Sequence, residues 1–185
     1  MVIETEKRKI IFIHPPRCSG TSIEYCLLRG RMVPDGSKHL NASQVKKIIG
    51  KEEWDKAFKF GIVRNPWDRM SSLFVTEEPP FSNYNSNSNY TISQFVERYH
   101  PMPWEHGVQC CDYMNEELDL IIKYEDRTNG IVELNEILSE FGMSVDPGVR
   151  KRSHEKNRNF MEYFDEESNE KMNEKFKCDI ERWYS

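Results

Sequence analysis

Short apolar runs alternate along the chain with segments whose apolar residues recur at helical spacing. The runs at residues 9–14, 58–64 and 118–124 are rich in β-branched and aromatic residues, which is typical of buried strands. Helices are predicted at residues 20–28, 41–50, 66–75, 91–99 and 129–141, and from residue 165 onward. This alternation predicts an α/β fold with a central, mainly parallel sheet flanked by helices.

Residues typical of helix ends and loops mark several of these boundaries. Asn41 or Ser43 caps the second predicted helix, and Gly50 stops it. Pro66 fits the first turn of the third helix, where a missing N–H group costs nothing. The segment 78–90 is rich in Pro, Ser and Asn and has no apolar period. We interpret that segment as a loop of the length of a substrate lid.

The last predicted helix has a single apolar face. This face is formed at four-residue steps by Phe164, Ser168, Met172, Phe176 and Ile180. Such a stripe predicts packing into a core rather than a binding surface. Because no repeat or change of composition divides the chain, residues 1–185 are predicted to form a single domain.

Composition and charge limit the classes of partner. The net charge of −5 argues against a general nucleic-acid or anionic-membrane binder, although it leaves room for a local basic pocket. No apolar run approaches the roughly 18 residues of a membrane span. The charged residues 1–9 lack the apolar stretch of a signal peptide. We therefore expect a cytoplasmic protein that engages neither membrane nor nucleic acid.

The five cysteines suggest neither a disulfide framework nor a metal site. Their number is odd and no CxxC pair occurs, so we interpret them as reduced thiols. Paired Cys and His spacing of the kind that binds zinc is also missing from the sequence, and no metal is expected.

The segment 14–22, HPPRCSGTS, has the parts of a phosphate-binding turn between a strand and a helix. Small residues let the backbone approach a ligand, and the first turn of a helix offers unpaired N–H groups and a positive dipole end. Arg17 adds a fixed cation. A plain tight turn is the alternative. The Walker A pattern GxxxxGK[ST] does not occur, which disfavours a P-loop kinase or ATPase.

A second motif, RNPWDRMSS at residues 64–72, begins at the end of the second predicted strand. Ser72 lies eight residues after Arg64, about two helical turns into the next helix. A strand-end Arg and a helix Ser at this spacing are able to converge on one phosphate group.

With both motifs in this order, the chain resembles the sulfotransferases that use 3′-phosphoadenosine-5′-phosphosulfate (PAPS). It looks closest to the carbohydrate branch, which includes heparan sulfate 2-O- and chondroitin-type enzymes. That family carries a PKxGGTS-like loop for the 5′-phosphosulfate and an RNPxxRxxS motif for the 3′-phosphate. Here the corresponding residues are 16–22, PRCSGTS, and 64–72, and further similarity extends from about residue 9 to 184.

The resemblance implies a P-loop-like three-layer fold and transfer of a sulfuryl group from PAPS to a hydroxyl or amine acceptor, without a metal. The acceptor would be a small molecule or a carbohydrate. Arg17 would stabilise the leaving phosphate, and a late basic loop would close over the nucleotide. The residues assigned in this way to PAPS and its product PAP are Arg17, Cys18, Ser19, Gly20, Thr21, Ser22, Arg64, Ser72, Arg150 and Arg152.

Two positions depart from the family loop. Arg17 stands where the family usually has a lysine that assists the leaving phosphate, and a planar guanidinium is not equivalent to an ammonium. Ser19 replaces a glycine, which restricts φ. These departures keep open a catalytically inactive protein that binds PAP or PAPS. A P-loop kinase-like phosphotransferase is a weaker alternative.

His39 is our candidate general base, because the resembling branch has a catalytic His in the corresponding stretch before the RNP motif. Packing near the helix at Asn41 is the alternative for this side chain. Glu24 or Glu105 would be the base if a carboxylate serves instead. We interpret His14 as a residue that braces the loop.

Overall fold

The computed structural model describes residues 1–30, 38–76, 91–98, 109–149 and 159–185. Three predicted features lie outside these ranges: the 78–90 loop, the candidate base Glu105, and the basic residues Arg150 and Arg152.

The described residues form a four-stranded mixed sheet with the order β1-β2-β3-β4. Its strands are β1 (Val2–Ile3), β2 (Ile10–Ile13), β3 (Phe58–Val63) and β4 (Leu120–Lys123). Both β2 and β4 pair with β3 in parallel, whereas β1 pairs with β2 antiparallel. The mainly parallel sheet of the α/β prediction is therefore confirmed. The antiparallel strand β1 was not predicted, because two residues carry no period that could be recognised.

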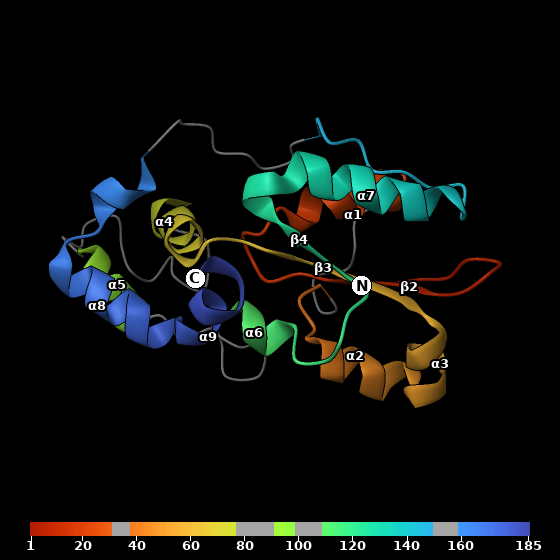
Figure 1. Cartoon of the computed structure of the whole chain (residues 1–185), viewed down its shortest axis with the longest axis horizontal. Helices are drawn as coiled ribbons and strands as arrows, with labels where there is room; N and C mark the ends of the chain where they lie inside the picture. Colours follow the sequence, from red (N-terminus) through yellow and green to blue (C-terminus); the bar gives the residue numbers. More distant parts are fainter. Residues whose placement is uncertain (31–37, 77–90, 99–108, 150–158) are drawn as a thin grey trace.

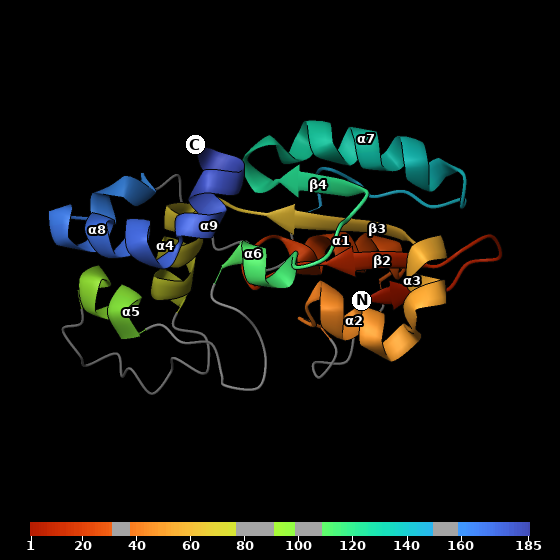
Figure 2. The same ribbon diagram turned by 60° about the horizontal axis from the view of Figure 1, so that its bottom comes forward.

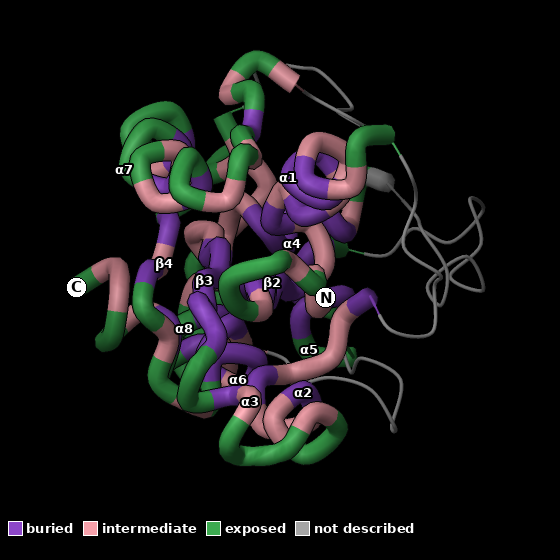
Figure 3. Tube along the Cα trace, turned by 90° about the vertical axis from the view of Figure 1, so that its right-hand side faces the viewer, coloured by how far each residue is buried: buried purple, intermediate pink, exposed green. Residues whose placement is uncertain are grey.

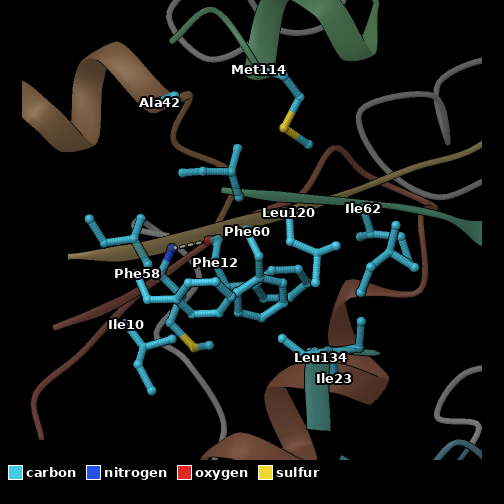
Figure 4. Packing of buried hydrophobic residues seen from close by; sticks show 14 of the residues in the cluster. Ile10, Phe12, Ile23, Ala42, Phe58, Phe60, Ile62, Met114, Leu120 and Leu134 are labelled. Carbon is cyan, nitrogen blue, oxygen red and sulfur yellow. Dashed lines mark hydrogen bonds between the residues drawn. The ribbon is translucent and has the colours of Figure 1, made fainter. Parts of the chain in front are cut away.

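Helices cover both faces of the sheet (Figures 1 and 3). One face is covered by α1 (Gly20–Leu27) and α7 (Arg127–Ser139), and the other by α2 (Ala42–Ile49) and α3 (Lys51–Lys56). The buried aromatic residues of the strands fill the space toward α1 and α7, where the rings of Phe12 and Phe60 stack with centroids 4.6 Å apart (Figure 4). On the opposite face of the sheet, Gly61 packs against Met114. A Cβ added at residue 61 would lie 2.6 Å from Sδ of Met114.

A second apolar cluster lies beyond the carboxyl ends of the parallel strands (Figure 2). It is built by α4 (Pro66–Thr76), α5 (Ile92–Arg98) and α8 (Glu166–Lys175). Ser168, Met172 and Phe176 are fully buried, so the predicted packing stripe of the last helix is confirmed. The remaining elements are α6 (Cys110–Tyr113), α9 (Lys177–Asp179), a π-helix (Ile180–Tyr184) and two 3₁₀ turns (Tyr124–Asp126 and Phe160–Tyr163). In the described ranges we find no helix of the length and apolar content that a membrane span requires.

Most predicted helix ends agree with the structure to within two residues. Asn41 is the cap of α2: its side-chain oxygen accepts from the backbone N of Gln44 at 2.8 Å. Gly50 ends α2 at φ +86°, but the chain resumes at once as α3, which was not predicted. The helix α7 starts two residues before the predicted 129, because a 3₁₀ turn leads directly into it.

The interpretation of all cysteines as reduced thiols is wrong for one pair. Cys111 and Cys178 form a disulfide that joins α6 to α9. The adjacent Asp179 carboxylate accepts from the backbone N–H groups of Cys110 and Cys111, both at 2.7 Å. The two short helices are therefore held together by a covalent bond and by charge-assisted hydrogen bonds. Cys18, Cys26 and Cys110 are free thiols.

Candidate functional site

The sheet brings the two sequence motifs to the same edge. The first motif follows β2 and the second follows β3, and these strands are parallel neighbours with Ile13 opposite Gly61. Carboxyl ends of parallel strands meet at one edge, and ligands of open α/β folds bind outside that edge. The 14–22 loop and the start of α4 therefore lie side by side.

Arg17 contacts both Ser72 and Arg64 there. Nε of Arg17 donates to Oγ of Ser72 at 3.1 Å, although 55 residues separate them. Nη1 of Arg64 donates to the carbonyl oxygen of Arg17 at 2.7 Å. Arg17 thus bridges Arg64 and Ser72, the two residues whose spacing predicts a shared phosphate site.

The guanidinium of Arg64 is fixed on several sides. Its Nε and Nη2 each donate to the Asp68 carboxylate at 2.7 Å, and its Cζ lies 4.3 Å from the centroid of the Tyr124 ring. Burial alone would lower the pKa of Arg64, but the hydrogen bonds and charge of Asp68 raise it above its ordinary value. Arg64 is therefore a pre-oriented, permanently charged donor.

Two further arginines brace the same loop. Arg69 is fully buried, and its Nε donates to the carbonyl oxygen of Pro16 at 3.1 Å. Arg127, from the start of α7, donates through Nη1 to Oγ of Ser19 at 2.9 Å. Sequence reasoning assigned neither residue. Arg69 is the second arginine of RNPWDRMSS, so the motif itself was a signal, whereas Arg127 belongs to no motif in the sequence.

The loop backbone adopts conformations that side chains disfavour. Arg17 and Ser19 have φ values of +67° and +66°, in the left-handed region. For non-glycine residues this conformation persists only when surrounding contacts impose it. At Gly20 a Cβ would lie 2.0 Å from Nδ1 of His14, so only glycine fits at the first residue of α1. This contact agrees with the interpretation of His14 as a loop-bracing residue.

A buried cluster of ionisable side chains links α1 to the residue that follows β2. Nε2 of His14 lies 2.9 Å from Oε1 of Glu24, and Nζ of Lys38 lies 3.4 Å from Oε2 of the same carboxylate. Burial lowers the pKa of His14, which favours the neutral ring. Burial would raise the pKa of Glu24, but His14 and Lys38 lower it below the ordinary value. Glu24 is therefore an ionised structural carboxylate, which makes it a weak candidate for a general base.

His39 lies next to the loop. Its Nδ1 is 3.2 Å from the carbonyl oxygen of His14, and the two imidazole rings meet edge to face at 4.8 Å. A carbonyl oxygen only accepts, so the hydrogen bond places the proton on Nδ1. In the neutral ring Nε2 then carries the lone pair, which is the state that a general base requires.

The side chains of the loop divide into two groups. Cys18 is fully buried and shares a hydrogen bond with the thiol of Cys110, whose pKa is raised mainly by burial. Ser22 is also buried, so neither of these two side chains is exposed at the surface of the loop. Thr21 is half-buried, and its hydroxyl accepts from Lys38 at 3.2 Å.

The described residues contain no group of three or more His, Cys, Asp or Glu side chains that could hold a metal ion. The donor set at the loop consists of cations, a serine and a threonine, and this set suits phosphate oxygens. Comparisons with models of protein families, with curated proteins and with solved structures found no match for this chain.

Proposed function

We propose that this protein is a PAPS-dependent sulfotransferase with a P-loop-like nucleotide site. One observation carries the proposal: at the carboxyl edge of a parallel sheet, Arg17 of the first motif contacts Arg64 and Ser72 of the second, which lie 47 and 55 residues further along the chain. A bisphosphate nucleotide fits this donor set, because two anionic groups need separate clusters of donors.

The two ends of the nucleotide have different partners. Arg64 and Ser72 hold the 3′-phosphate, which distinguishes PAPS from ATP. The main chain at Gly20 and the Thr21 hydroxyl hold the 5′ end at the start of α1. Arg17, between the two groups, stabilises the negative charge that develops on the departing phosphate.

When bound, PAPS supplies the sulfuryl group. Nε2 of His39 accepts the proton of the acceptor hydroxyl or amine while the acceptor atom bonds to sulfur and the bond from sulfur to the 5′-phosphate oxygen breaks. The hydrogen bond from Nδ1 to the His14 carbonyl keeps the ring in the required tautomer and stabilises the imidazolium that forms. The products are the sulfated acceptor and PAP, and the acceptor is a small molecule or a carbohydrate.

Calorimetry with PAP and ADP tests the nucleotide assignment. The wild-type protein should bind PAP at least about tenfold more tightly than ADP, because only PAP offers a 3′-phosphate to Arg64 and Ser72. Ser72→Ala should weaken PAP binding and leave ADP binding unchanged. Ser71→Ala is the matched control, since the Ser71 hydroxyl donates to the Asp68 carbonyl within α4. Equal affinity of the wild type for PAP and ADP would contradict the assignment.

A second candidate, a PAP- or PAPS-binding protein without transferase activity, is favoured by the position of Arg17. Its Nε already donates to Ser72, so the cation that the family places on the leaving phosphate is engaged elsewhere. Transfer of labelled sulfate from PAPS to a panel of acceptors separates the two candidates. His39→Ala should reduce turnover strongly with PAP binding nearly intact. PAP binding without transfer to any acceptor would favour the second candidate.

A further inference from the structure

We propose that Lys38 is a positioning residue for the 5′ end of the nucleotide, and that it acts through the hydroxyl of Thr21. The inference rests on the proposed function, which it deepens by assigning a residue outside both sequence motifs. Lys38 immediately precedes His39 and is 7% exposed.

The contacts of Lys38 are unusual for a lysine in a soluble protein. Nζ donates to Oγ1 of Thr21 at 3.2 Å and lies 3.4 Å from the Glu24 carboxylate. Lysines are almost never this buried unless a charge partner compensates them. Glu24 supplies that compensation at 3.4 Å. The Thr21 hydroxyl is a second and shorter contact of the same ammonium group, at 3.2 Å, and balancing the charge of Glu24 does not require it.

The direction of the Lys38–Thr21 hydrogen bond determines what the threonine hydroxyl can do. A lysine ammonium only donates, so Oγ1 of Thr21 must accept. The hydroxyl proton of Thr21 is then directed away from Lys38 and is available to donate to an anion. A hydroxyl that accepts from a cation is also a stronger donor, because the two hydrogen bonds polarise each other.

Thr21 stands where such a donor meets the 5′ end. It is the second residue of α1, next to Gly20 at the N-terminus of an eight-residue helix whose first N–H groups point toward the loop. Nε of Arg17 is engaged with Ser72, and Lys38 adds a second positive charge behind the 5′ side of the site.

Two ligands that differ only at the 5′ position test the inference. PAP carries both phosphates, and 3′-AMP lacks the 5′-phosphate. Lys38→Met should weaken PAP binding by about tenfold and change 3′-AMP binding by less than about twofold. Thr21→Val should show the same pattern. Since the two residues act in series, the double variant should be no weaker toward PAP than the more affected single variant.

Controls separate positioning from folding and from charge balance. Retained 3′-AMP binding shows that Lys38→Met is folded, and Lys38→Gln replaces it if the Met variant does not fold. Lys46→Met is the matched control, because Lys46, on α2, forms its ion pair with Glu116. The double variant Glu24→Gln with Lys38→Met should still lose PAP affinity. Recovery of PAP binding in that variant would show that Lys38 only balances Glu24.

The outcomes distinguish the inference from the proposed function. Wild-type protein that binds neither PAP nor 3′-AMP overturns the proposed function and the role of Lys38 with it. Wild-type protein that binds PAP selectively, together with a Lys38→Met variant that binds both ligands normally or loses both equally, overturns the role of Lys38 alone.

Discussion

The replacement of Arg64 by Lys keeps a positive charge at the end of β3 and removes the planar fork that organises the site. Arg64 donates twice to Asp68 and once to the Arg17 carbonyl, and all three distances are 2.7 Å. Its side chain is 13% exposed and that of Asp68 is 20% exposed. A lysine ammonium has no planar array of donors that could make these three bonds at once, so the expected loss is one bond to Asp68 and the bond to Arg17.

The size of the effect follows from these two lost bonds. A hydrogen bond that involves a charged group contributes roughly 1.5–3 kcal/mol, and partial relaxation recovers some of this free energy. We expect R64K to lower the free energy of unfolding by about 2–4 kcal/mol. With a urea m-value of about 2–3 kcal/mol/M, the midpoint should fall by roughly 1 M.

Urea unfolding followed by far-UV circular dichroism measures this shift. A double-mutant cycle with Asp68→Asn then isolates the pair: R64K and D68N should couple, so that the double variant is more stable than the sum of the two single effects predicts. If R64K unfolds within about 0.5 kcal/mol of the wild type, or if the two effects add, the Arg64 fork does not organise the site as described.

Three further predictions concern stability. Gly20→Ala should cost about 1–3 kcal/mol in urea unfolding, because its Cβ would meet the His14 ring, and the same substitution should cost less when made in a His14→Ala variant than in the wild type. The pKa values of His14 and Glu24 are both lowered, so the unfolded chain binds protons more readily than the native one. The urea midpoint should therefore fall as the pH drops below 6.5 and again below 4.5, and His14→Phe should remove the first step. Without reductant, Cys111→Ser should lower the free energy of unfolding by roughly 4 kcal/mol, because the disulfide no longer restricts the unfolded chain, and its melting temperature should fall accordingly. With dithiothreitol present, the variant and the wild type should melt at the same temperature.

Predictions from sequence succeeded where local patterns determine the structure. The apolar runs of β2 and β3 are buried along their whole length, β4 is buried at alternate residues, and Asn41 caps α2 through a contact only three residues away. The passage from β3 into α4 was also predicted, with Pro66 as the first residue of the helix.

Features that depend on distant residues were missed. The strand β1 exists because Val2 and Ile3 find partners in β2, and the disulfide joins cysteines 67 residues apart. The contact of Lys38 with Thr21 is likewise a tertiary contact, and no local period or motif indicates it. For the site, the sequence indicated which residues belong to the two motifs, whereas the partners that hold Arg17 in place became visible only in the structure.

The junction of α6 and α9 bears on how the chain folds during synthesis. The Asp179 carboxylate accepts hydrogen bonds from the N–H groups at the start of α6, and Asp179 lies 69 residues after Cys110. A helix of four residues has no stability of its own, so α6 forms only when this carboxylate arrives. While the chain emerges from the ribosome, Cys110 and Cys111 thus remain without their native cover until residue 179 has been translated and has left the exit tunnel. A ribosome-bound chain stopped before that residue should react with a thiol-modifying reagent at both positions, whereas in the completed fold Cys110 is buried and Cys111 is bonded to Cys178.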